Sequence, residues 1–353
     1  MRVNILCSID KRPSGPNRQL LEYGNHLCSK GHDIAVIKPV IRRYPRKKKD
    51  SFEIKLGEIA HFISGKRVRP IKKLPWIDIK CPVKIIPSID ERYLGEAEIV
   101  FFSMESSLPM VEKLPERCGK KVMRVCSILY AERVSYIPEN IYIIAISTLV
   151  KKVLEERLQR EAPVLFNAVN TKMFAKDIPR GEPKTIGMVY YPNNWHKGMD
   201  DGFWVMEQLH QRYPFLKFQV AGEWKERDIP PFVKFIDGKK KNNLLNFYKD
   251  TDILIASCIK EAFLNPPMEA MASRCAVVTT EVGGISDYTI PDKTAIVVQP
   301  KDKEGILKGV IALLENNDYF RSVSEEGYKK IQEFSVEAQG DKLERILSDI
   351  LKK

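Results

Sequence analysis

Short apolar runs of four to eight residues alternate with segments of helical pattern along most of this chain, and this alternation restricts the fold more than any other feature. The runs are residues 2–8, 34–40, 98–103, 120–125 and 141–147, followed by 184–191, 216–222, 233–236, 252–257, 276–280 and 294–299. Strands that follow one another through helices form parallel sheets covered on both faces. The sequence therefore predicts an α/β fold.

The first helical segment carries the clearest helix signals in the chain. Pro16 suits a first helical position, Leu20, Tyr23 and Leu27 recur at helical spacing, and Gly31 suits a helix stop. Similar patterns predict helices at residues 200–211, 242–249, 268–273 and 303–316. These helices separate the predicted strands in the order that a doubly wound fold requires.

The length of 353 residues predicts two domains rather than one core. Pro and Gly become frequent within residues 165–184, where a strand also ends, so we expect the boundary there. Two doubly wound domains that face each other would leave a central cleft at the carboxyl ends of their sheets, where such folds bind ligands.

Composition argues against several other classes of protein. No apolar run approaches the ~20 residues of a membrane span, and the N-terminus lacks the apolar stretch of a signal peptide. The seven cysteines are dispersed without a paired spacing or a histidine pattern typical of zinc. We expect reduced thiols, no metal site and a cytoplasmic location.

The stretch "KEAFLNPPMEAMASRCAVV", residues 260–278, carries two carboxylates around a Pro-Pro loop. It follows a predicted strand and enters a helix, whose first turn would contain Glu269 and present backbone N–H groups suited to a phosphate. Glu261 and Glu269 would accept hydrogen bonds from hydroxyl groups. Phosphate and sugar hydroxyls together describe a nucleotide sugar, although the helix dipole alone also favours an early glutamate.

"KEAFLNPPMEAMASRCAVVTTEVGGISDY" resembles the signature of retaining glycosyltransferases of the GT-B fold, family 4 (glycosyl transferases group 1). "SGPNRQLLEYGNHLCSKGHDIAVI", "VLFNAVNTKMF" and "TIGMVYYPNNWHKGMDDG" are similar to other segments of that family, in the same order. The resemblance implies an acceptor-binding Rossmann-like domain at 1–168, with 335–353 packing back on it, and a nucleotide-sugar-binding Rossmann-like domain at 169–334.

Matched residue by residue, the resemblance assigns the two carboxylates different partners. Glu269 would hold the ribose hydroxyls of the nucleotide, and Glu261 would contact the donor sugar. Backbone N–H groups of Phe263 and Leu264 would lie near sugar or phosphate. The family's Glu-Gly-Phe-Gly here reads Glu261-Ala262-Phe263-Leu264, which narrows the room around the sugar.

The same resemblance assigns a cation and three glycines to the donor phosphate. Lys197 would neutralise the departing diphosphate, and Gly15 would let the N-terminal loop approach it closely. Gly283 and Gly284 resemble a turn beside the cleft, and a tight strand–helix connection remains the alternative interpretation. Lys197 and Glu261 are thus the predicted catalytic residues.

Two features of the family's pattern are missing. The family usually places an Arg five residues before the phosphate-binding Lys, where this chain has Pro192. His196, Asn193 and Asn194 are the candidates to compensate, and each is also a plausible solvent-facing loop residue.

Many members also carry a His after a strand of the N-terminal domain, and the matching segment "RVCSILYAER" has none. Ser127, Tyr130 and Glu132 are its polar candidates, with a structural role as the alternative. His26 and His32 lie on or just after the first helix and are explained by helix packing and termini.

Much of the net charge of +12 is concentrated in residues 42–73, which contain twelve basic and three acidic residues. Apolar side chains, including Trp76, are mixed with these cations or follow closely. The pattern predicts contact with an anionic membrane surface or the acceptor through Arg46, Lys47, Lys48, Lys49 and Trp76. A solvated loop is the alternative.

Together these features predict a transferase that moves a sugar from a nucleotide-diphosphate sugar to an acceptor hydroxyl. The resemblance implies retention of configuration, no required metal or other cofactor, and an acceptor glycan or lipid-linked acceptor at the inner membrane face. A GT-B epimerase or glycogen-type synthase, and a non-catalytic sugar-nucleotide-binding protein, remain the alternatives. Nucleic-acid binding rests on charge alone, and we expect none.

Overall fold

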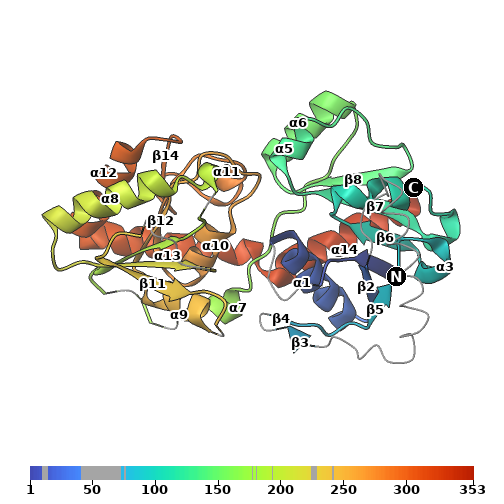
Figure 1. Ribbon diagram of the computed structural model, residues 1–353, viewed down its shortest axis with the longest axis horizontal. Coiled ribbons are helices and arrows are strands. Elements are labelled where there is room, and N and C mark those ends of the chain that lie inside the picture. Colours follow the sequence, from blue (N-terminus) through green and yellow to red (C-terminus); the bar gives the residue numbers. More distant parts are fainter. Residues whose placement is uncertain are drawn as a thin grey trace. The chain divides into compact units, whose positions relative to one another are not determined.

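The computed structural model describes residues 1–9, 15–40, 73–74, 77–176, 178–179, 181–192, 194–223, 229–240 and 242–353. The chain divides into two compact units (Figure 1). The N-terminal unit comprises Met1–Ile146, Val150–Phe166 and Gln339–Lys353, and the C-terminal unit comprises Ser147–Leu149 and Asn167–Ala338. The chain first passes between the units near residue 147 and crosses again at 166 and 338, beside the expected boundaries of 168 and 334.

The N-terminal unit is built on a six-stranded parallel sheet in the order β5-β2-β1-β6-β7-β8. Its strands are β1 (Arg2–Leu6), β2 (Asp33–Pro39), β5 (Val83–Ile86), β6 (Ile99–Phe102), β7 (Lys120–Val125) and β8 (Ile141–Ala145). The two-residue strands β3 (Lys73–Leu74) and β4 (Ile77–Asp78) pair antiparallel outside this sheet.

The C-terminal unit repeats this topology in a second six-stranded parallel sheet, in the order β11-β10-β9-β12-β13-β14. Its strands are β9 (Thr185–Val189), β10 (Lys217–Gly222), β11 (Val233–Asp237), β12 (Ile253–Ala256), β13 (Ala276–Thr280) and β14 (Ile296–Val298). Numbered within its unit, each sheet has the strand order 3-2-1-4-5-6 of a doubly wound Rossmann fold.

Helices separate most consecutive strands, as the alternating pattern predicts. In the N-terminal unit they are α1 (Gly15–Ser29), α3 (Glu91–Leu94), α4 (Leu108–Val111), α5 (Ile128–Ala131) and α6 (Thr148–Leu158). The C-terminal unit contains α7 (Thr171–Phe174), α8 (Met199–Arg212), α9 (Asn243–Asp250), α10 (Asn265–Ala272), α11 (Ile285–Tyr288), α12 (Lys303–Glu315) and α13 (Asn317–Ile331). Helix α14 (Val336–Lys352) ends the chain. Four 3₁₀ turns are η1 (Glu105–Ser107), η2 (Glu116–Cys118), η3 (Trp195–Lys197) and η4 (Gln332–Phe334).

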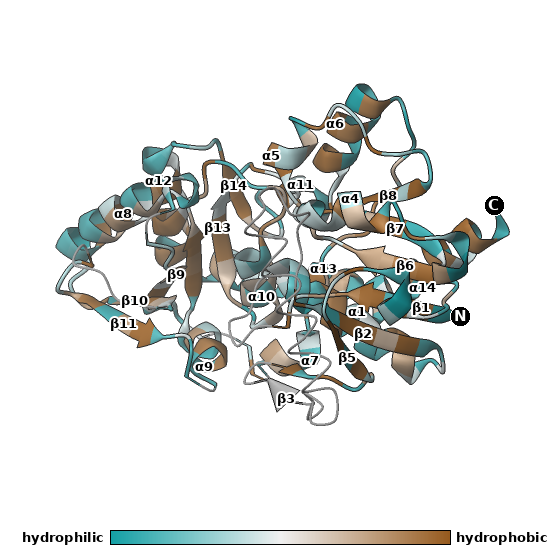
Figure 2. Ribbon diagram, turned by 45° about the vertical axis from the view of Figure 1, so that its right-hand side comes forward, coloured by the Kyte–Doolittle hydropathy of each residue, from teal (hydrophilic) through white to brown (hydrophobic). Residues whose placement is uncertain are grey.

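The sheets lie in the core because parallel strands are covered on both faces. Strand β6 is buried at all four positions and β13 at all five. Figure 2 shows strands such as β2 and β9 in brown, whereas helix α8 carries both colours. That helix buries Phe203, Met206 and Leu209 and exposes Glu207, the amphipathic pattern of a surface helix.

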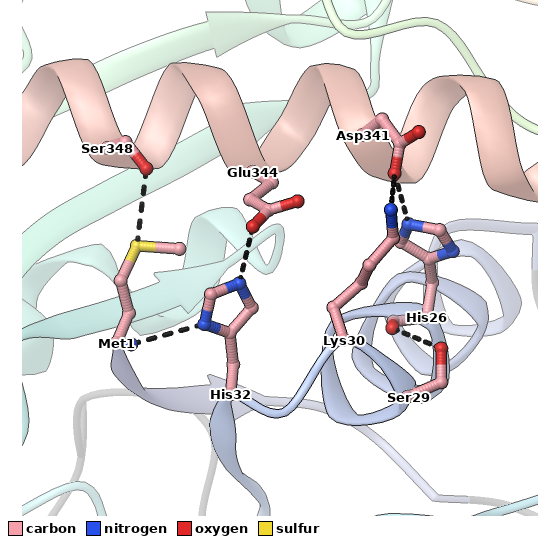
Figure 3. Close-up of polar contacts among 8 residues, drawn as sticks. All are labelled: Met1, His26, Ser29, Lys30, His32, Asp341, Glu344 and Ser348. Carbon is pink, nitrogen blue, oxygen red and sulfur yellow. Dashed lines mark hydrogen bonds and ion pairs between the residues drawn. The ribbon is translucent and has the colours of Figure 1, made fainter.

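Helix α14 belongs to the N-terminal unit from Gln339 onward, whereas the predicted range was 335–353. Figure 3 shows Asp341 accepting contacts from His26 Nε2 at 2.8 Å and Lys30 Nζ at 3.0 Å. One turn along, Glu344 lies 2.8 Å from His32 Nε2. His26 and His32 thus join α1 and the start of β2 to α14, and the packing interpretation of both histidines is confirmed. Lys30 and His26 lower the pKa of Asp341.

A buried arginine fixes the segment where the chain leaves the N-terminal unit. Arg124, fully buried at the end of β7, donates to the backbone oxygen of Leu165 from Nε (3.3 Å) and Nη2 (3.0 Å). The Tyr23 hydroxyl donates to the oxygen of Phe166. Burial raises the pKa of Tyr23, which therefore stays protonated as a donor. These contacts position residues 165–166 directly before the second unit begins.

Candidate functional site

The candidate site of the C-terminal unit lies where the strand order of its sheet reverses. Strands β9 and β12 are adjacent and parallel, and the chain winds from them toward opposite edges of the sheet. Doubly wound sheets bind ligands outside the carboxyl ends of the strands at this switch point. The loop after β9 contains Lys197, and the loop after β12 contains Glu261.

A left-handed glycine joins these two loops. Gly198 has φ of 62°, and a Cβ there would lie 1.8 Å from the backbone oxygen of Ser257. The Ser257 hydroxyl in turn donates to the oxygen of Gly198 at 2.6 Å. The backbone N–H of Ile259 donates to the oxygen of His196 at 2.7 Å. This close approach requires a glycine and fixes Lys197 against the β12 loop.

Lys197 and Glu261, the two predicted catalytic residues, form an ion pair. Lys197 Nζ lies 2.5 Å from Glu261 Oε2, and both side chains are largely shielded from solvent. The other carboxylate oxygen of Glu261 accepts the backbone N–H of Ala262 at 3.0 Å. Lys197 Nζ also lies 4.8 Å from the ring centre of Tyr191. The structure thus brings a cation, a carboxylate and an aromatic face together at the switch point.

The second carboxylate of the motif lies inside helix α10. The sequence placed the helix start at residue 268, with Glu269 in the first turn, and this was wrong. The helix begins at Asn265, so Glu269 lies in the second turn. Pro266 and Pro267 occupy the first turn, where a proline's missing N–H has no intrahelical partner to lose. Glu269 is 7% exposed.

Two tyrosines that the sequence analysis did not identify surround Glu269. Burial, followed by the Glu269 charge, raises the pKa of Tyr248 on α9 and of Tyr191 after β9. Both hydroxyls therefore stay protonated and can donate hydrogen bonds. Tyr191 is the last residue of the predicted strand 184–191, and its place at a strand's carboxyl end was the signal available in the sequence. Tyr248 had no such signal.

Gly283 and Gly284 form a turn against the Glu261 loop. Gly283 has φ of 56°, and a Cβ there would lie 2.4 Å from the oxygen of Glu261. A Cβ on Gly284 would lie 2.3 Å from the ring of Phe263. Phe263 is buried, and Leu264 accepts a hydrogen bond from the Tyr288 hydroxyl at 2.9 Å through its backbone oxygen. The side chains of both donor-loop residues are thus buried within the unit.

His196 does not supply the positive charge that the missing arginine would have supplied. Burial, followed by the adjacent Lys197, lowers the pKa of His196 from its ordinary value of 6.5, so the ring is neutral at pH 7. Asn194 precedes the 3₁₀ turn η3, and Asn193 lies outside the described residues. Pro192 follows Tyr191 in the same loop.

The N-terminal unit carries its own polar groups after β6 and β7. Ser127 caps α5 by accepting the N–H of Tyr130 at 3.2 Å, which is the structural alternative named for it. Glu105 directly follows β6 and was not among the predicted residues. Burial raises its pKa, and burial and Glu105 together raise the pKa of Tyr130 to about 12. Glu132 lies just beyond α5.

The remaining predicted residues are not part of the candidate site of the C-terminal unit. Gly15 is the first residue of α1 in the N-terminal unit. Arg46, Lys47, Lys48, Lys49 and Trp76 lie outside the described residues. Within the described residues, no group of three or more His, Cys, Asp or Glu side chains is placed to hold a metal ion. No helix in the same part of the chain is long and apolar enough to cross a membrane.

Comparison with known proteins agrees with this geometry. Residues 171–330 match the family described as glycosyl transferases group 1. An uncharacterized glycosyltransferase of Methanocaldococcus jannaschii is 22% identical over 204 residues, 55% of this chain and 56% of that protein. A human phosphatidylinositol N-acetylglucosaminyltransferase subunit is 27% identical over 188 residues, 49% of this chain and 39% of that protein. The matches thus span about half or less of these relatives.

Solved structures resemble the chain over almost its full length. The HepE protein of Anabaena, in complex with UDP, superposes with a TM-score of 0.72 at 14% identity and covers 99% of this chain and 100% of that one. The same protein has been solved with UDP-glucose. The chain has the GT-B fold of two Rossmann-like units. The range of the C-terminal unit that matches the glycosyl transferases group 1 family, residues 171–330, includes Lys197, Glu261 and Glu269.

Proposed function

We propose that the protein transfers a sugar from a nucleoside-diphosphate sugar to an acceptor hydroxyl, with retention of the anomeric configuration. The observation that carries this proposal is the Lys197–Glu261 ion pair at the switch point of a group 1 domain, beside the buried Glu269. A diphosphate needs a cation, and ribose and hexose hydroxyls need carboxylate acceptors. The binding of UDP and UDP-glucose by a structural relative supports the choice of donor.

Each residue has a distinct task in the proposed reaction. Lys197 stabilises the negative charge that develops on the diphosphate as the bond to the sugar breaks. Glu261, already 2.5 Å from Lys197, accepts hydrogen bonds from the sugar that remains beside that phosphate. Glu269 accepts the ribose hydroxyls, and the N-terminus of α10 favours the phosphate charge. The reaction as proposed requires no metal.

Without a donor, Glu261 is paired with Lys197, which is the cation that the diphosphate needs. Donor binding must therefore shift Lys197 from its carboxylate partner toward the phosphate, or place the phosphate so that Lys197 contacts both. With Pro192 in the usual arginine position and a neutral His196, Lys197 carries this task alone among these loop residues. We therefore expect the reaction to depend more strongly on this one lysine than it would if two cations were present.

We place the acceptor hydroxyl at the N-terminal unit, beside Glu105 and Tyr130. Both follow strands of its sheet at the carboxyl end, and burial raises the pKa of each. A carboxylate in a poorly solvated position is a good hydrogen-bond acceptor for an incoming hydroxyl. Glu105 would thus hold the acceptor in a unit whose residues 124–133 lack the histidine that many proteins of the resembling family carry.

The nucleotide part of the proposal is tested by thermal shift with UDP, GDP, ADP, dTDP and CDP, each beside its monophosphate. A ligand at 100 times its Kd adds about 2.7 kcal/mol to the free energy of unfolding. We expect one diphosphate to stabilise the protein clearly more than its monophosphate. No stabilisation by any of them would reject the nucleotide site.

The reaction is tested with the sugar nucleotide that carries the preferred base. Release of the diphosphate, together with a new α- or β-glycosidic bond of the same configuration as the donor, supports a retaining transferase. Interconversion of the donor without release would instead identify an epimerase. Binding with neither outcome would identify a non-catalytic binding protein.

We further propose that residues 42–73 bring the protein to an anionic membrane that carries a lipid-linked acceptor, in glycolipid or surface-polysaccharide assembly at the cytoplasmic face. The net charge of +9 in this segment supports the proposal, as does the phosphatidylinositol in the name of the human relative. Each cation near such a surface contributes about 1 kcal/mol. The segment lies outside the described residues, so the proposal rests on sequence.

Vesicle co-sedimentation tests the membrane proposal. We expect binding to vesicles that contain phosphatidylglycerol, little binding to phosphatidylcholine alone, and loss of binding as salt is raised. Replacing Arg46, Lys47, Lys48 and Lys49 with Ser should weaken binding. Replacing Lys151, Lys152, Lys293 and Lys329 with Ser removes the same charge elsewhere and should have a smaller effect. Equal binding to both kinds of vesicle, or binding to neither, would reject the membrane proposal and favour a soluble acceptor.

A further inference from the structure

The C-terminal unit contains a pocket of about 870 Å³ that the proposed donor site does not use. It opens between the loop after β9, the start of α8 and the segment around Pro230. Lys197, Glu261 and Glu269 do not line it, although Tyr191 and Gly198 do. Its size lies within the range of ligand pockets in proteins, about 300–1,000 Å³. It therefore adjoins the donor loops without containing their charged residues.

One face of helix α8 supplies acidic and aromatic side chains to this pocket. Asp200, Trp204 and Glu207 are spaced by four and three residues, which places them on one side of a helix. Asp201 adds a further carboxylate. The dipole of helix α8 explains Asp200 and Asp201, because it favours acidic residues in a first turn. Glu207, in the third turn, has no such explanation.

Trp195, which also lines the pocket, presents an indole to solvent. Its residue is 71% exposed, which is unusual for the largest apolar side chain. It stands edge-on to the ring of His196, with ring centres 5.6 Å apart, so its face is not stacked on that neighbour. An exposed aromatic beside carboxylates offers a flat apolar surface together with hydrogen-bond acceptors.

The charge of the lining restricts the ligand. Among the described lining residues, three carboxylates against the one cation Lys301 disfavour a phosphate or a nucleotide. A cationic ligand is also disfavoured, because the Lys303 ammonium already lies 4.4 Å from the ring centre of Trp204. A neutral ligand with many hydroxyls is compatible both with the acidic lining and with the contact of Lys303 on Trp204. Its C–H faces stack on indole, and its hydroxyls donate to Asp and Glu.

We propose that this pocket binds a neutral oligosaccharide, with Trp195 as the stacking platform and Glu207 as a hydroxyl acceptor. The inference deepens the proposed function and rests on it, because a sugar chain held here would lie on the same unit as the donor loops. Its test is independent of catalysis, since the pocket can be occupied whether or not Lys197 acts on a donor.

The test uses the full chain and neutral trisaccharides of glucose, mannose, galactose and N-acetylglucosamine, with binding measured by saturation-transfer NMR and calorimetry. We expect at least one to bind saturably, and Trp195→Ala to weaken that binding about tenfold or more. Glu207→Gln, which keeps the size of the side chain, should weaken it several-fold. Phe215→Ala is the matched control, because Phe215 is 67% exposed on the same unit but does not line the pocket.

Several results would overturn the proposal. These are binding of no trisaccharide, equal binding by Trp195→Ala and wild type, or displacement of the trisaccharide by the preferred nucleoside diphosphate, which would place it in the donor site. Tighter binding of choline than of any trisaccharide would identify a cation pocket instead. Nucleoside-diphosphate affinity, measured on the same samples, separates failure of this proposal from failure of the donor site.

Discussion

The two units of the molecule have the same strand order but carry different chemistry at the point where that order reverses. In the C-terminal unit, the loops after β9 and β12 bring Lys197 and Glu261 to 2.5 Å, with Tyr191 beside them. In the N-terminal unit, the turn after β6 carries Glu105, and Tyr130 follows β7. One switch point contains a neutralised carboxylate, and the other contains a carboxylate whose pKa is raised by burial.

This difference shows that topology determines where a ligand binds, while side chains determine which ligand it is. A cation at the switch point suits the charged donor. A weakly solvated carboxylate beside a tyrosine suits a neutral acceptor hydroxyl, because it can accept a hydrogen bond without first releasing a cation. The predictions below test this division of tasks, from the largest expected effect to the smallest.

Lys197→Ala should have the largest effect. We expect kcat/KM to fall by roughly 100- to 1,000-fold, which corresponds to the loss of one charge-stabilising donor in the transition state. The reason is that neither Pro192 nor the neutral His196 supplies a second cation. Steady-state kinetics with the preferred donor provides the measurement.

Lys217→Ala is the matched control for Lys197→Ala, since Lys217 is exposed at the first position of β10, the amino end of the same sheet. It should behave as wild type. Glu261→Ala should mainly lower kcat without weakening nucleotide binding, because it removes the sugar contact and leaves Lys197 free to pair with the diphosphate. Near-wild-type turnover in Lys197→Ala would show that another cation binds the diphosphate.

Glu269→Ala should weaken binding of the preferred nucleoside diphosphate by roughly 10- to 150-fold, the range for hydrogen bonds to a charged group. A carboxylate that holds ribose acts in the ground state, so Kd should change more than kcat. Isothermal titration measures the Kd. Glu281→Ala removes an exposed carboxylate from the same unit and should leave it unchanged. An unaltered Kd in Glu269→Ala would remove Glu269 from the site.

Glu105→Gln should raise the KM for the acceptor and leave the nucleoside-diphosphate Kd at its wild-type value. We expect a change of about 2- to 10-fold, the range for one ordinary hydrogen bond. Measuring both constants on one variant tests the comparison directly, because the two switch points are predicted to respond separately. A change in nucleotide affinity instead would mean that Glu105 does not belong to an acceptor site.

Sequence reasoning found eleven of the twelve sheet strands because parallel strands are continuous apolar runs. It missed β5, which has only four residues and partly exposed positions between Pro82 and Pro87. It singled out Lys197 and Glu261 through the family resemblance, and the structure pairs these two side chains. It misplaced the start of α10 because Pro266 and Pro267 suggested a loop, whereas prolines are tolerated in a first helical turn.

The neighbours of the site were harder to predict than its motif residues. Tyr248 reaches Glu269 from a different helix, and Glu105 in the turn η1 influences Tyr130 on helix α5. Such pairs depend on how separate elements pack, and spacing along the chain contains no record of that packing. The effect of Lys197 on His196, by contrast, could be inferred from the sequence, because the two residues are adjacent.

The pH dependence of stability gives the smallest effect and tests the buried carboxylate itself. Burial raises the pKa of Glu105 above its ordinary value of 4.5, so the folded protein holds this proton more tightly than the unfolded chain does. Its contribution to stability is therefore complete below pH 4.5 and is lost as the pH rises through the folded-state pKa. Glutamine cannot ionise and avoids this loss.

Glu105→Gln should consequently gain in Tm relative to wild type between pH 4 and pH 7, and scanning calorimetry at both values measures the gain. Glu116→Gln, at an exposed position of the same unit, should show no pH-dependent difference. The same Tm difference at both pH values would mean that the Glu105 carboxylate is as well solvated or neutralised as Glu261 is by Lys197. Lys197 would then be the one feature that distinguishes the switch point of the C-terminal unit from that of the N-terminal unit.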